Sequence, residues 1–400
     1  MTGRAVWPLI LMAAMGGHAM AAQPAAAGPA AKPDAISMLV AQLSIDRYKA
    51  DIKALTRYGD RRQGTKRNRD AIAWIESQLK SYGCPTARLS YVYDPARRFR
   101  AAVPASGGFA VGGGRPRGFR RPTAPNTDPR AQPDAKLRRL DSEVAPPGRR
   151  EEVYCTKTGA GHPGEMYIVS AHMDGIGYGE AANDDGSGTA LVMELARVLN
   201  RPGVRTDRSV RFILWNNEET GLDGARAYVT ARRALQGKED PAHSGRFPEP
   251  KWLGVIQHDM VMFDHGMPRS DSTVSREQRP EADLNVEFQS ASRSAAQSQA
   301  LAWALQKANE DYATDYPAVV GPHMTNTDSE PFQDFVASVS VRENERGTQI
   351  GNGWDPQWHQ PTDLYSTYSE KDFRLGLNAA QTTLAAVARL TGASLAAGSK

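Results

Sequence analysis

The sequence predicts an α/β protein built on a mostly parallel, mixed central sheet with helices on both faces. After residue 151, short apolar segments alternate with segments of helical spacing, and acidic or imidazole side chains follow several of the apolar segments. Strand–helix alternation of this kind is typical of a sheet covered on both faces. Of the 400 residues, 40% are apolar and 24% are charged, which allows a sizeable core and excludes collagen-like, coiled-coil and wholly disordered proteins.

The first 21 residues are typical of an export signal. Arg4 is the sole early charge, residues 5–15 are mostly apolar, and Ala19-Met20-Ala21 offers the small residues that a signal peptidase requires. A membrane anchor is the alternative, but the apolar run is short and contains proline. We therefore expect a signal peptide at 1–21, a mobile Ala/Pro-rich leader at 22–35, and a periplasmic or secreted protein without stable membrane association after cleavage.

Helical spacing begins the folded region, which we expect to be one domain from residue 36 to residue 400. Apolar residues recur at three- and four-residue intervals between residues 36 and 82, with a break at Gly64-Thr65. A short strand is expected at 89–93. The remaining strands are expected at 166–171, 210–215, 253–257 and 335–341, and the remaining helices at 188–199, 224–235 and 375–390.

Residues 97–150 interrupt this pattern. They hold 13 Lys or Arg against four Asp or Glu, together with seven Gly and eight Pro, and they show no apolar periodicity. Such a composition predicts a disordered insertion that is dispensable for chemistry. A nucleic-acid-binding tail is the alternative, but interleaved aromatic residues are scarce and the net charge of the whole chain is only +4. We expect no nucleic-acid partner.

The two cysteines are open to two interpretations. Cys84 follows a helical pattern, and Cys155 lies in a predicted strand. In an oxidising compartment these residues can form a disulfide or remain as two buried thiols. A zinc site that uses both cysteines is not expected, because the neighbouring sequence offers no further ligands.

Acidic and imidazole side chains gather where the predicted strands end. His172 follows one strand, Glu219 follows the next, and Asp259 follows a third, while Asp184 lies in a turn that opens a helix. Ligands of open α/β sheets bind beyond the carboxyl ends of the strands. Carboxylates crowded there repel one another unless cations are present. The sequence therefore predicts a metal centre.

The residue types select the metal. One histidine and several carboxylates without cysteine suit zinc, or cobalt or manganese in its place. His172, Asp184, Glu219 and Asp259 exceed the three protein ligands of a usual catalytic zinc, so a shared carboxylate and a two-metal hydrolase are predicted.

Two further carboxylates have predicted roles around this centre. Glu218 is adjacent to a ligand and could act as the general base. The carboxylate of Asp174 could accept a hydrogen bond from the His172 imidazole and fix its tautomer. Each short motif alone is also typical of a solvated turn, and His258 is interpreted as a packed neighbour. The ordered occurrence of these motifs at successive strand ends favours the metal centre.

The motifs as a set resemble the co-catalytic di-zinc aminopeptidase family. That family contains secreted bacterial leucine-type aminopeptidases, glutamate carboxypeptidase, glutaminyl cyclase and the inactive transferrin-receptor ectodomain. The resemblance extends from about residue 57 to the C-terminus and skips residues 97–150. It rests on the segments RYGDRRQGT at 57–65, SAHMD at 170–174, NDDGSG at 183–188, NEETGL at 217–222 and QHDM at 257–260.

The resemblance implies a zinc-exopeptidase fold of the phosphorylase/hydrolase-like type and two zinc ions per chain. Five ligands are implied: His172 and Asp259 on one ion, Glu219 and His359 on the other, and Asp184 bridging both. His359 is supplied by the segment WHQPTD at 358–363, and the implied general base is Glu218. Two residues depart from the family pattern. Glu330 stands where a histidine is common, and Trp358 where some relatives have a tyrosine.

The resemblance implies a metallo-aminopeptidase, a hydrolase that acts on peptide substrates, and the predicted signal peptide implies that it is exported. A single-zinc glutaminyl cyclase and a metal-free binding ectodomain of the same fold are the alternatives, and the full ligand set argues against both. Residues 262–297 are expected to border the substrate pocket. The sequence does not define the preferred N-terminal residue, the choice between aminopeptidase, carboxypeptidase and dipeptidase, or the oligomeric state.

Overall fold

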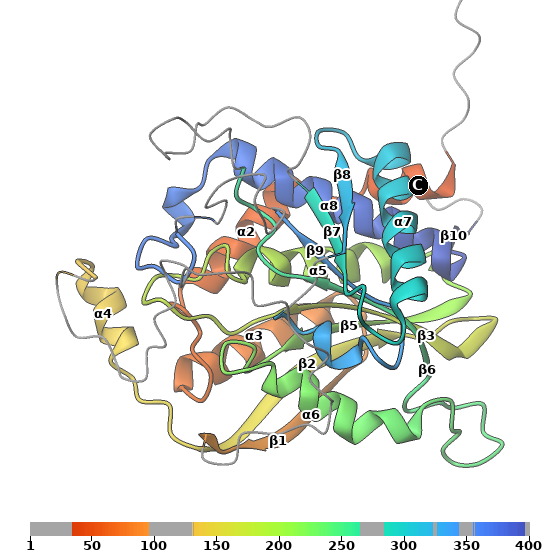
Figure 1. Cartoon of the computed structure of the whole chain (residues 1–400), viewed down its shortest axis with the longest axis horizontal. Coiled ribbons are helices and arrows are strands. Elements are labelled where there is room, and N and C mark those ends of the chain that lie inside the picture. The colour runs from red at the N-terminus through yellow and green to blue at the C-terminus, as the bar shows by residue number, and fades with distance from the viewer. Residues whose placement is uncertain are drawn as a thin grey trace, which may run out of the picture. The chain divides into compact units, whose positions relative to one another are not determined.

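The computed structural model describes residues 34–95, 130, 132–264, 284–322, 326–343, 355 and 357–396 (Figure 1). The predicted signal peptide and residues 22–33 of the predicted leader lie outside them. Helix α1 (Ala35–Val40) begins inside the range predicted for the leader, because the Asp34 side chain caps it by accepting a hydrogen bond from the Ser37 amide. Within the described ranges, no helix has the length and apolar character needed to cross a bilayer.

A mixed sheet of eight strands forms the centre of the described chain, in the order β1-β2-β5-β3-β6-β9-β7-β8. The neighbours β5, β3, β6 and β9 run parallel, whereas β2 is antiparallel to β5 and β7 is antiparallel to β9. The predicted α/β class with a mostly parallel mixed sheet is therefore confirmed. The strands are β1 (Thr86–Tyr93), β2 (Gly148–Lys157), β3 (His162–His172), β5 (Arg208–Trp215), β6 (Lys251–His258), β7 (Leu284–Phe288), β8 (Ala318–Gly321) and β9 (Ser338–Arg342).

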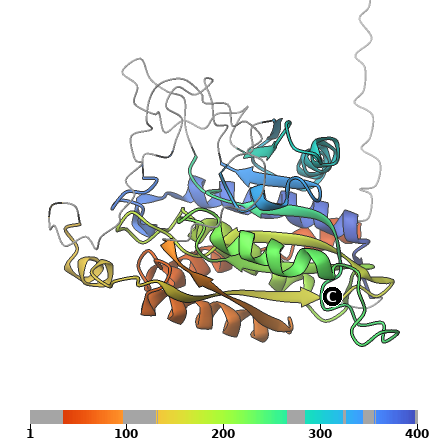
Figure 2. The ribbon, with the colours of Figure 1, turned by 60° about the horizontal axis from the view of Figure 1, so that its bottom comes forward.

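Helices cover both faces of this sheet, and α6 and α8 lie on opposite sides of it (Figures 1 and 2). The larger hydrophobic core joins one face of the sheet to most of the helices, and a smaller, aromatic core lies between the sheet and α6. The other helices are α2 (Ile45–Thr56), α3 (Lys66–Ser81), α4 (Ala135–Asp141), α5 (Gly186–Leu199), α6 (Asp223–Arg232), α7 (Ala295–Tyr312) and α8 (Glu370–Thr391). The short strands β4 (Val204–Arg205) and β10 (Ser394–Leu395) pair with each other outside the main sheet.

The prediction of a disordered insertion up to residue 150 is wrong for its last part. Residues 135–141 form α4, which Asp134 caps, and the first residues of β2 pair with β1. The buried side chain of Gln132 donates a hydrogen bond to the Tyr178 carbonyl at 2.8 Å. The capping aspartate and a buried Leu137 are local folding signals that the Gly, Pro and Arg content of the segment conceals. Residues 97–129 lie outside the described chain.

Three elements between residues 284 and 321 were not predicted. Strand β7 contains Asn285 and Glu287, which are buried polar residues, so its sequence lacks a continuous apolar run. Helix α7 packs against β7, β8 and β9 and against α8. Of the segment 262–297 that was expected to border the substrate pocket, residues 284–297 form β7, the start of α7 and the turn between them, and their place at the pocket stays a prediction. Residues 265–283 lie outside the described chain.

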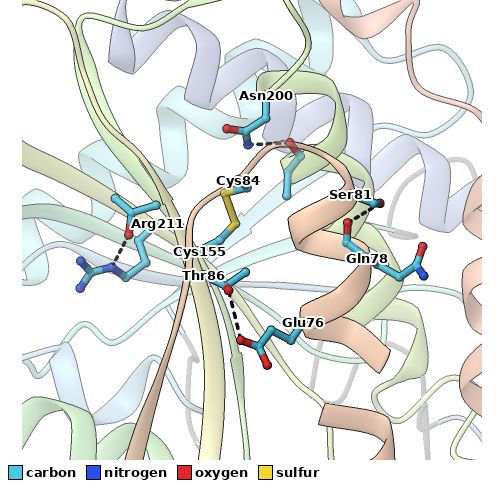
Figure 3. Close-up of a disulfide and its surroundings, with 10 residues drawn as sticks. Glu76, Gln78, Ser81, Cys84, Thr86, Cys155, Asn200 and Arg211 are labelled. Atoms are coloured by element: carbon cyan, nitrogen blue, oxygen red, sulfur yellow. Dashed lines mark hydrogen bonds between the residues drawn. A yellow bond between two sulfur atoms is a disulfide. The ribbon is translucent and has the colours of Figure 1, made fainter. Parts of the chain in front are cut away.

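Cys84 and Cys155 are joined by a disulfide, with Cα atoms 5.6 Å apart (Figure 3). Cys84 follows α3, and Cys155 lies in β2 and pairs with Thr86 of β1. The bond therefore links the end of α3 to the antiparallel edge of the sheet. Of the two interpretations open from the sequence, the disulfide is the one that the structure shows.

Candidate metal centre

The predicted ligands follow neighbouring parallel strands. His172 is the last residue of β3, Glu218 and Glu219 follow β5, and Asp259 follows β6. Because β3 pairs in parallel with both β5 and β6, these three strand ends lie side by side. Asp184 comes from the loop between β3 and α5. The crevice beyond the strand ends thus brings together side chains that are up to 87 residues apart in sequence.

Two pairs of ligand atoms lie on either side of the Asp184 carboxylate. On one side, Oδ1 of Asp184 is 3.3 Å from Nε2 of His172, which is itself 3.6 Å from Oδ1 of Asp259. On the other side, Oδ2 of Asp184 is 3.0 Å from Nε2 of His359, which is also 3.0 Å from Oε2 of Glu219. Each oxygen of one carboxylate therefore faces a different histidine–carboxylate pair.

These separations fit two zinc ions. Atoms that bind one zinc at about 2.0–2.2 Å with tetrahedral angles lie about 3.3–3.6 Å apart, which is close to the distances between the predicted ligands. Oε1 of Glu219 is buried and has no hydrogen-bond partner among the described residues, so a cation could use it. The donor set, two imidazoles and three carboxylates, also suits zinc. The residues present therefore fit a pair of ions with Asp184 between them.

His359 reaches the centre from a loop between β9 and α8. Its backbone has a φ of 54°, in the left-handed region that few non-glycine residues adopt, and its ring stacks on Trp358 with centroids 4.2 Å apart. The sequence resemblance assigned this histidine, and the structure places it beside Asp184 and Glu219 as that assignment requires.

Glu218 and Glu219 lie in a tight turn and face different parts of the centre. The Glu218 carbonyl accepts hydrogen bonds from the amides of Gly221 and Leu222, both at 2.9 Å, and Asn217 has a φ of 66°. Glu218 has a ligand atom within 4.8 Å of His172 and Asp259, whereas Glu219 groups with His172 and Asp184 and lies 3.0 Å from His359. The turn lets adjacent side chains take separate positions, which an extended strand would not allow.

Asp174 contacts His172 through a different atom from the one predicted. Nδ1 of His172 lies 2.9 Å from the main-chain carbonyl of Asp174, whereas the carboxylate oxygen Oδ1 is 4.0 Å away. Since a carbonyl can only accept, Nδ1 carries the proton and Nε2 is left free to bind a metal. The Asp174 carboxylate instead accepts a hydrogen bond from the Glu218 amide at 3.2 Å. Asp174 thus supports both residues.

Two aspartates hold the ligand loops and were not singled out from the sequence. Asp185 accepts hydrogen bonds from the amides of His172, Gly188 and Met260, so it joins β3, α5 and the loop after β6. Asp363 accepts from the amides of Asn183 and Asp184 at 2.9 and 3.1 Å. For Asp185, the available sequence signal was the Asp-Asp-Gly-Ser run at 184–187, which is typical of a helix start. For Asp363, it was the segment 358–363 that also supplies His359.

Arg342, the last residue of β9, is a further residue that sequence reasoning missed. Its Nη2 donates to Oδ2 of Asp259, so the other oxygen of that carboxylate faces His172. A charged residue at the end of a buried strand was the available signal. His258 is confirmed as a packed neighbour, because its two ring nitrogens are hydrogen-bonded to the Ser170 carbonyl and the Thr383 hydroxyl.

The electrostatics of the centre call for positive charge. Burial raises the pKa of Glu219 to about 7, against the opposing effect of His359. Burial also raises the pKa of Asp184, but hydrogen bonds with His172 and His359 outweigh it and lower that pKa to about 2. For His172, burial lowers the pKa, and nearby carboxylates, Asp185 first among them, outweigh burial and raise it well above its usual value. Imidazole protons or bound cations can supply the charge that the carboxylates require.

Glu330, which departs from the family pattern, is held at the neighbouring turn. Its Oε1 is 3.2 Å from Nη2 of Arg226, and its Oε2 accepts from the Asn326 amide. Nε of Arg226 donates to the carbonyl of Gly221, just after the paired glutamates. Through Arg226, the Glu330 side chain therefore connects the 326–332 turn to the turn that carries Glu218 and Glu219.

Residues 153–383 match the model of peptidase family M28, and the chain therefore belongs to that family. Among curated relatives, aminopeptidase YwaD of Bacillus subtilis is 46% identical over 68 residues, or 17% of this chain and 14% of the relative. Leupeptin-inactivating enzyme 1 of Streptomyces exfoliatus is 38% identical over 101 residues, or 25% of this chain and 20% of the relative. The matched segment is thus at most about a fifth of the length of these two relatives.

Solved structures share the fold along most of the chain. An aminopeptidase from Aneurinibacillus sp. strain AM-1 superposes with a TM-score of 0.57 at 17% identity, covering 89% of this chain and 96% of that one. A glutaminyl cyclase of Porphyromonas gingivalis superposes with a TM-score of 0.53 at 13% identity, covering 87% and 99%. These likenesses establish the common fold, and the reaction has to be argued from the site.

Proposed function

We propose that the chain is an exported di-zinc aminopeptidase that hydrolyses the N-terminal peptide bond of peptides. The observation that carries the proposal is the Asp184 carboxylate, whose two oxygens face the His172–Asp259 pair and the His359–Glu219 pair at 3.0 to 3.3 Å. A single-zinc glutaminyl cyclase would need one of these pairs, and a binding ectodomain would need neither. The presence of both pairs supports a two-metal hydrolase.

In the proposed mechanism, Asp184, His172 and Asp259 would hold one zinc, and Asp184, Glu219 and His359 would hold the other. Two bound zinc ions would lower the pKa of an attacking water and polarise the scissile carbonyl. Glu218 would take a proton from the attacking water and deliver it to the leaving amine. The turn at 217–222 holds Glu218 on the His172 side of the centre, and the Asp174 carboxylate fixes its main chain.

Zinc content tests the metal part of this proposal. Purified full-length protein, treated with zinc and desalted, should contain about two zinc ions per chain by elemental analysis and should lose activity to a chelator. One tightly bound zinc in a fully active preparation would contradict the two-metal model.

A substrate panel tests the specificity part. Aminoacyl 4-nitroanilides and free peptides should be cleaved, whereas N-acetylated peptides should not. Cleavage of N-acetylated peptides from the carboxyl end would instead indicate a carboxypeptidase. One curated relative, from Homo sapiens, is named carboxypeptidase Q. Cyclisation of glutaminyl peptides without hydrolysis would indicate the cyclase.

Export is tested by N-terminal sequencing of the protein recovered from the periplasm or medium of a bacterial producer. A mature chain that begins at about residue 22 supports the signal peptide predicted at 1–21. An uncleaved chain retained in the membrane fraction would support the anchor.

A further inference from the structure

Arg61 is a fully buried arginine whose guanidinium contacts the loop between two of the proposed ligands. It lies between α2 and α3, with a relative exposure of 0%. Its Nε donates to the Met173 carbonyl at 2.8 Å, and Nη2 donates to the Ala181 carbonyl at 2.8 Å. Nη1 donates to the Glu180 carbonyl at 2.9 Å and to Gly59 at 3.2 Å. All four hydrogen bonds go to main-chain carbonyls.

Three of these carbonyls lie near proposed metal ligands in the sequence. Met173 directly follows His172, whereas Glu180 and Ala181 shortly precede Asp184. The loop between them, residues 173–185, contains no helix or strand. One rigid, planar guanidinium therefore fastens both ends of the loop that separates a terminal ligand from the bridging ligand.

Asn68, in the first turn of α3, extends the same support to the second ligand loop. Its amide forms a reciprocal pair with Asn216, each side chain donating to the other at 3.1 Å. Asn216 follows β5 and precedes the turn of Glu218 and Glu219. The Asn68 side chain also donates to the Arg61 carbonyl at 2.8 Å, so the two residues form one connected unit.

The local sequence holds this unit in place. Arg61 has a φ of 52°, a left-handed conformation that directs the chain back on itself after Gly59. Asp60 forms a buried ion pair with Arg67 at 2.6 Å, and the Thr65 side chain caps α3 by accepting from the Asn68 amide. A buried cation is costly unless its N–H groups are hydrogen-bonded, and the four contacts with main-chain carbonyls meet that requirement for Arg61.

We propose that Arg61, together with Asn68, is a positioning unit that sets the separation of the ligand loops 172–184 and 216–219 and thereby the geometry of the metal centre. The proposal rests on the two-zinc function proposed above. Both residues precede the segment 153–383 that matches the family model, so the metal centre depends on a part of the chain outside that segment. A lysine cannot replace Arg61, because one ammonium group cannot span carbonyls that the guanidinium reaches with three nitrogens.

The test uses full-length protein and the variants Arg61→Lys and Asn68→Ala. Arg69→Lys is the matched control, since Arg69 is an exposed arginine of α3, the helix that carries Asn68. Zinc is titrated into chelator-stripped protein by calorimetry, and hydrogen–deuterium exchange is measured on the metal-free protein. Kinetics on a leucyl 4-nitroanilide supply kcat and KM separately.

For Arg61→Lys we expect zinc affinity to fall roughly 10–100-fold, the range seen when residues that orient metal ligands are lost. Exchange should accelerate at least tenfold in peptides covering 173–185 and 216–222, and kcat should fall with little change in KM. Asn68→Ala should accelerate exchange mainly in 216–222, and it keeps the proposal testable if Arg61→Lys does not fold. The control should match the wild type.

Wild-type zinc affinity and loop exchange in both variants would overturn the proposal and leave the two-zinc function standing. Faster exchange spread over the whole protein, with unchanged zinc affinity of the folded chain, would also overturn it, because that result describes a general stabilising role. If the wild type itself binds no zinc, the proposed function fails, and exchange that accelerates only in the two loops would still support the positioning role.

Discussion

The adjacent glutamates 218 and 219 can be separated by parallel Gln substitutions. Glu219 has Oε2 at 3.0 Å from Nε2 of His359, so Glu219→Gln removes an anionic donor from that side of the centre. Glu218 lies with His172 and Asp259, and Glu218→Gln removes the group proposed to carry the proton. Gln matches Glu in size, so neither change should disturb the turn that the Glu218 carbonyl closes.

The expected magnitudes differ in kind. Losing a residue that only orients a ligand costs about 10–100-fold in metal affinity, so losing a ligand itself should cost more than about 100-fold for one zinc ion. Losing a general base costs about 10²–10⁴-fold in rate, or about 3–5 kcal/mol of transition-state stabilisation. Glu218→Gln should therefore retain two zinc ions and lose turnover, whereas Glu219→Gln should retain one and recover partly at high zinc.

Elemental analysis after gel filtration measures the zinc content, and initial rates over a range of zinc concentrations measure the recovery. Inhibition by a competitive, metal-binding inhibitor gives a third readout, which should be near normal for Glu218→Gln and weakened for Glu219→Gln. The assignment of roles would be refuted if Glu218→Gln were zinc-depleted and Glu219→Gln zinc-replete. Equal zinc content and equal turnover in both variants would refute it as well.

Three further predictions concern stability. Replacing Cys84 and Cys155 by Ala opens a cross-link between residues 71 apart, which should lower the free energy of unfolding by about 4 kcal/mol in urea titrations, and a loss below about 1 kcal/mol would contradict this estimate. Glu249→Ala leaves the buried Arg211 guanidinium without its carboxylate and should cost about 3–5 kcal/mol in the same titration, whereas Glu249→Gln should cost less. Burial, with a smaller contribution from a nearby glutamate, raises the pKa of Asp51 from 3.8 to about 7, so its contribution to stability is most favourable below pH 4 and is lost as the pH rises through 7. The full shift corresponds to about 4 kcal/mol. Because Asp51 is only partly buried, Asp51→Asn should stabilise by about 1–2 kcal/mol at pH 8 and by little at pH 4, and an equal effect at both pH values would contradict the assignment.

The local sequence determined the parts of this protein that depend on short-range pattern. Apolar segments such as 166–171 and 210–215 predict buried strands because their period and length leave few alternatives. Parallel strands place their carboxyl ends at one edge, so residues that follow them, such as His172 and Asp259, could be expected to meet. The residue types alone indicated zinc, cobalt or manganese, and the family resemblance selected zinc among them. The assignment of His359 required the family resemblance, because no local pattern marks a distant ligand.

Tertiary structure decided what depends on contacts between distant segments. Arg61 meets carbonyls that are 112 to 120 residues away, and its sequence neighbourhood does not show where a guanidinium will be buried. The main-chain carbonyl of Asp174, and not its carboxylate, contacts the His172 imidazole, because the turn after β3 brings that carbonyl to the ring. Strand β7 was not predicted because it contains Glu287, a charged residue that local pattern does not assign to a buried strand. The fold can bury this carboxylate because Arg342 of β9 lies beside it and compensates its charge. Sequence pattern records which residues tend to be buried, whereas only the assembled fold determines which partners they find.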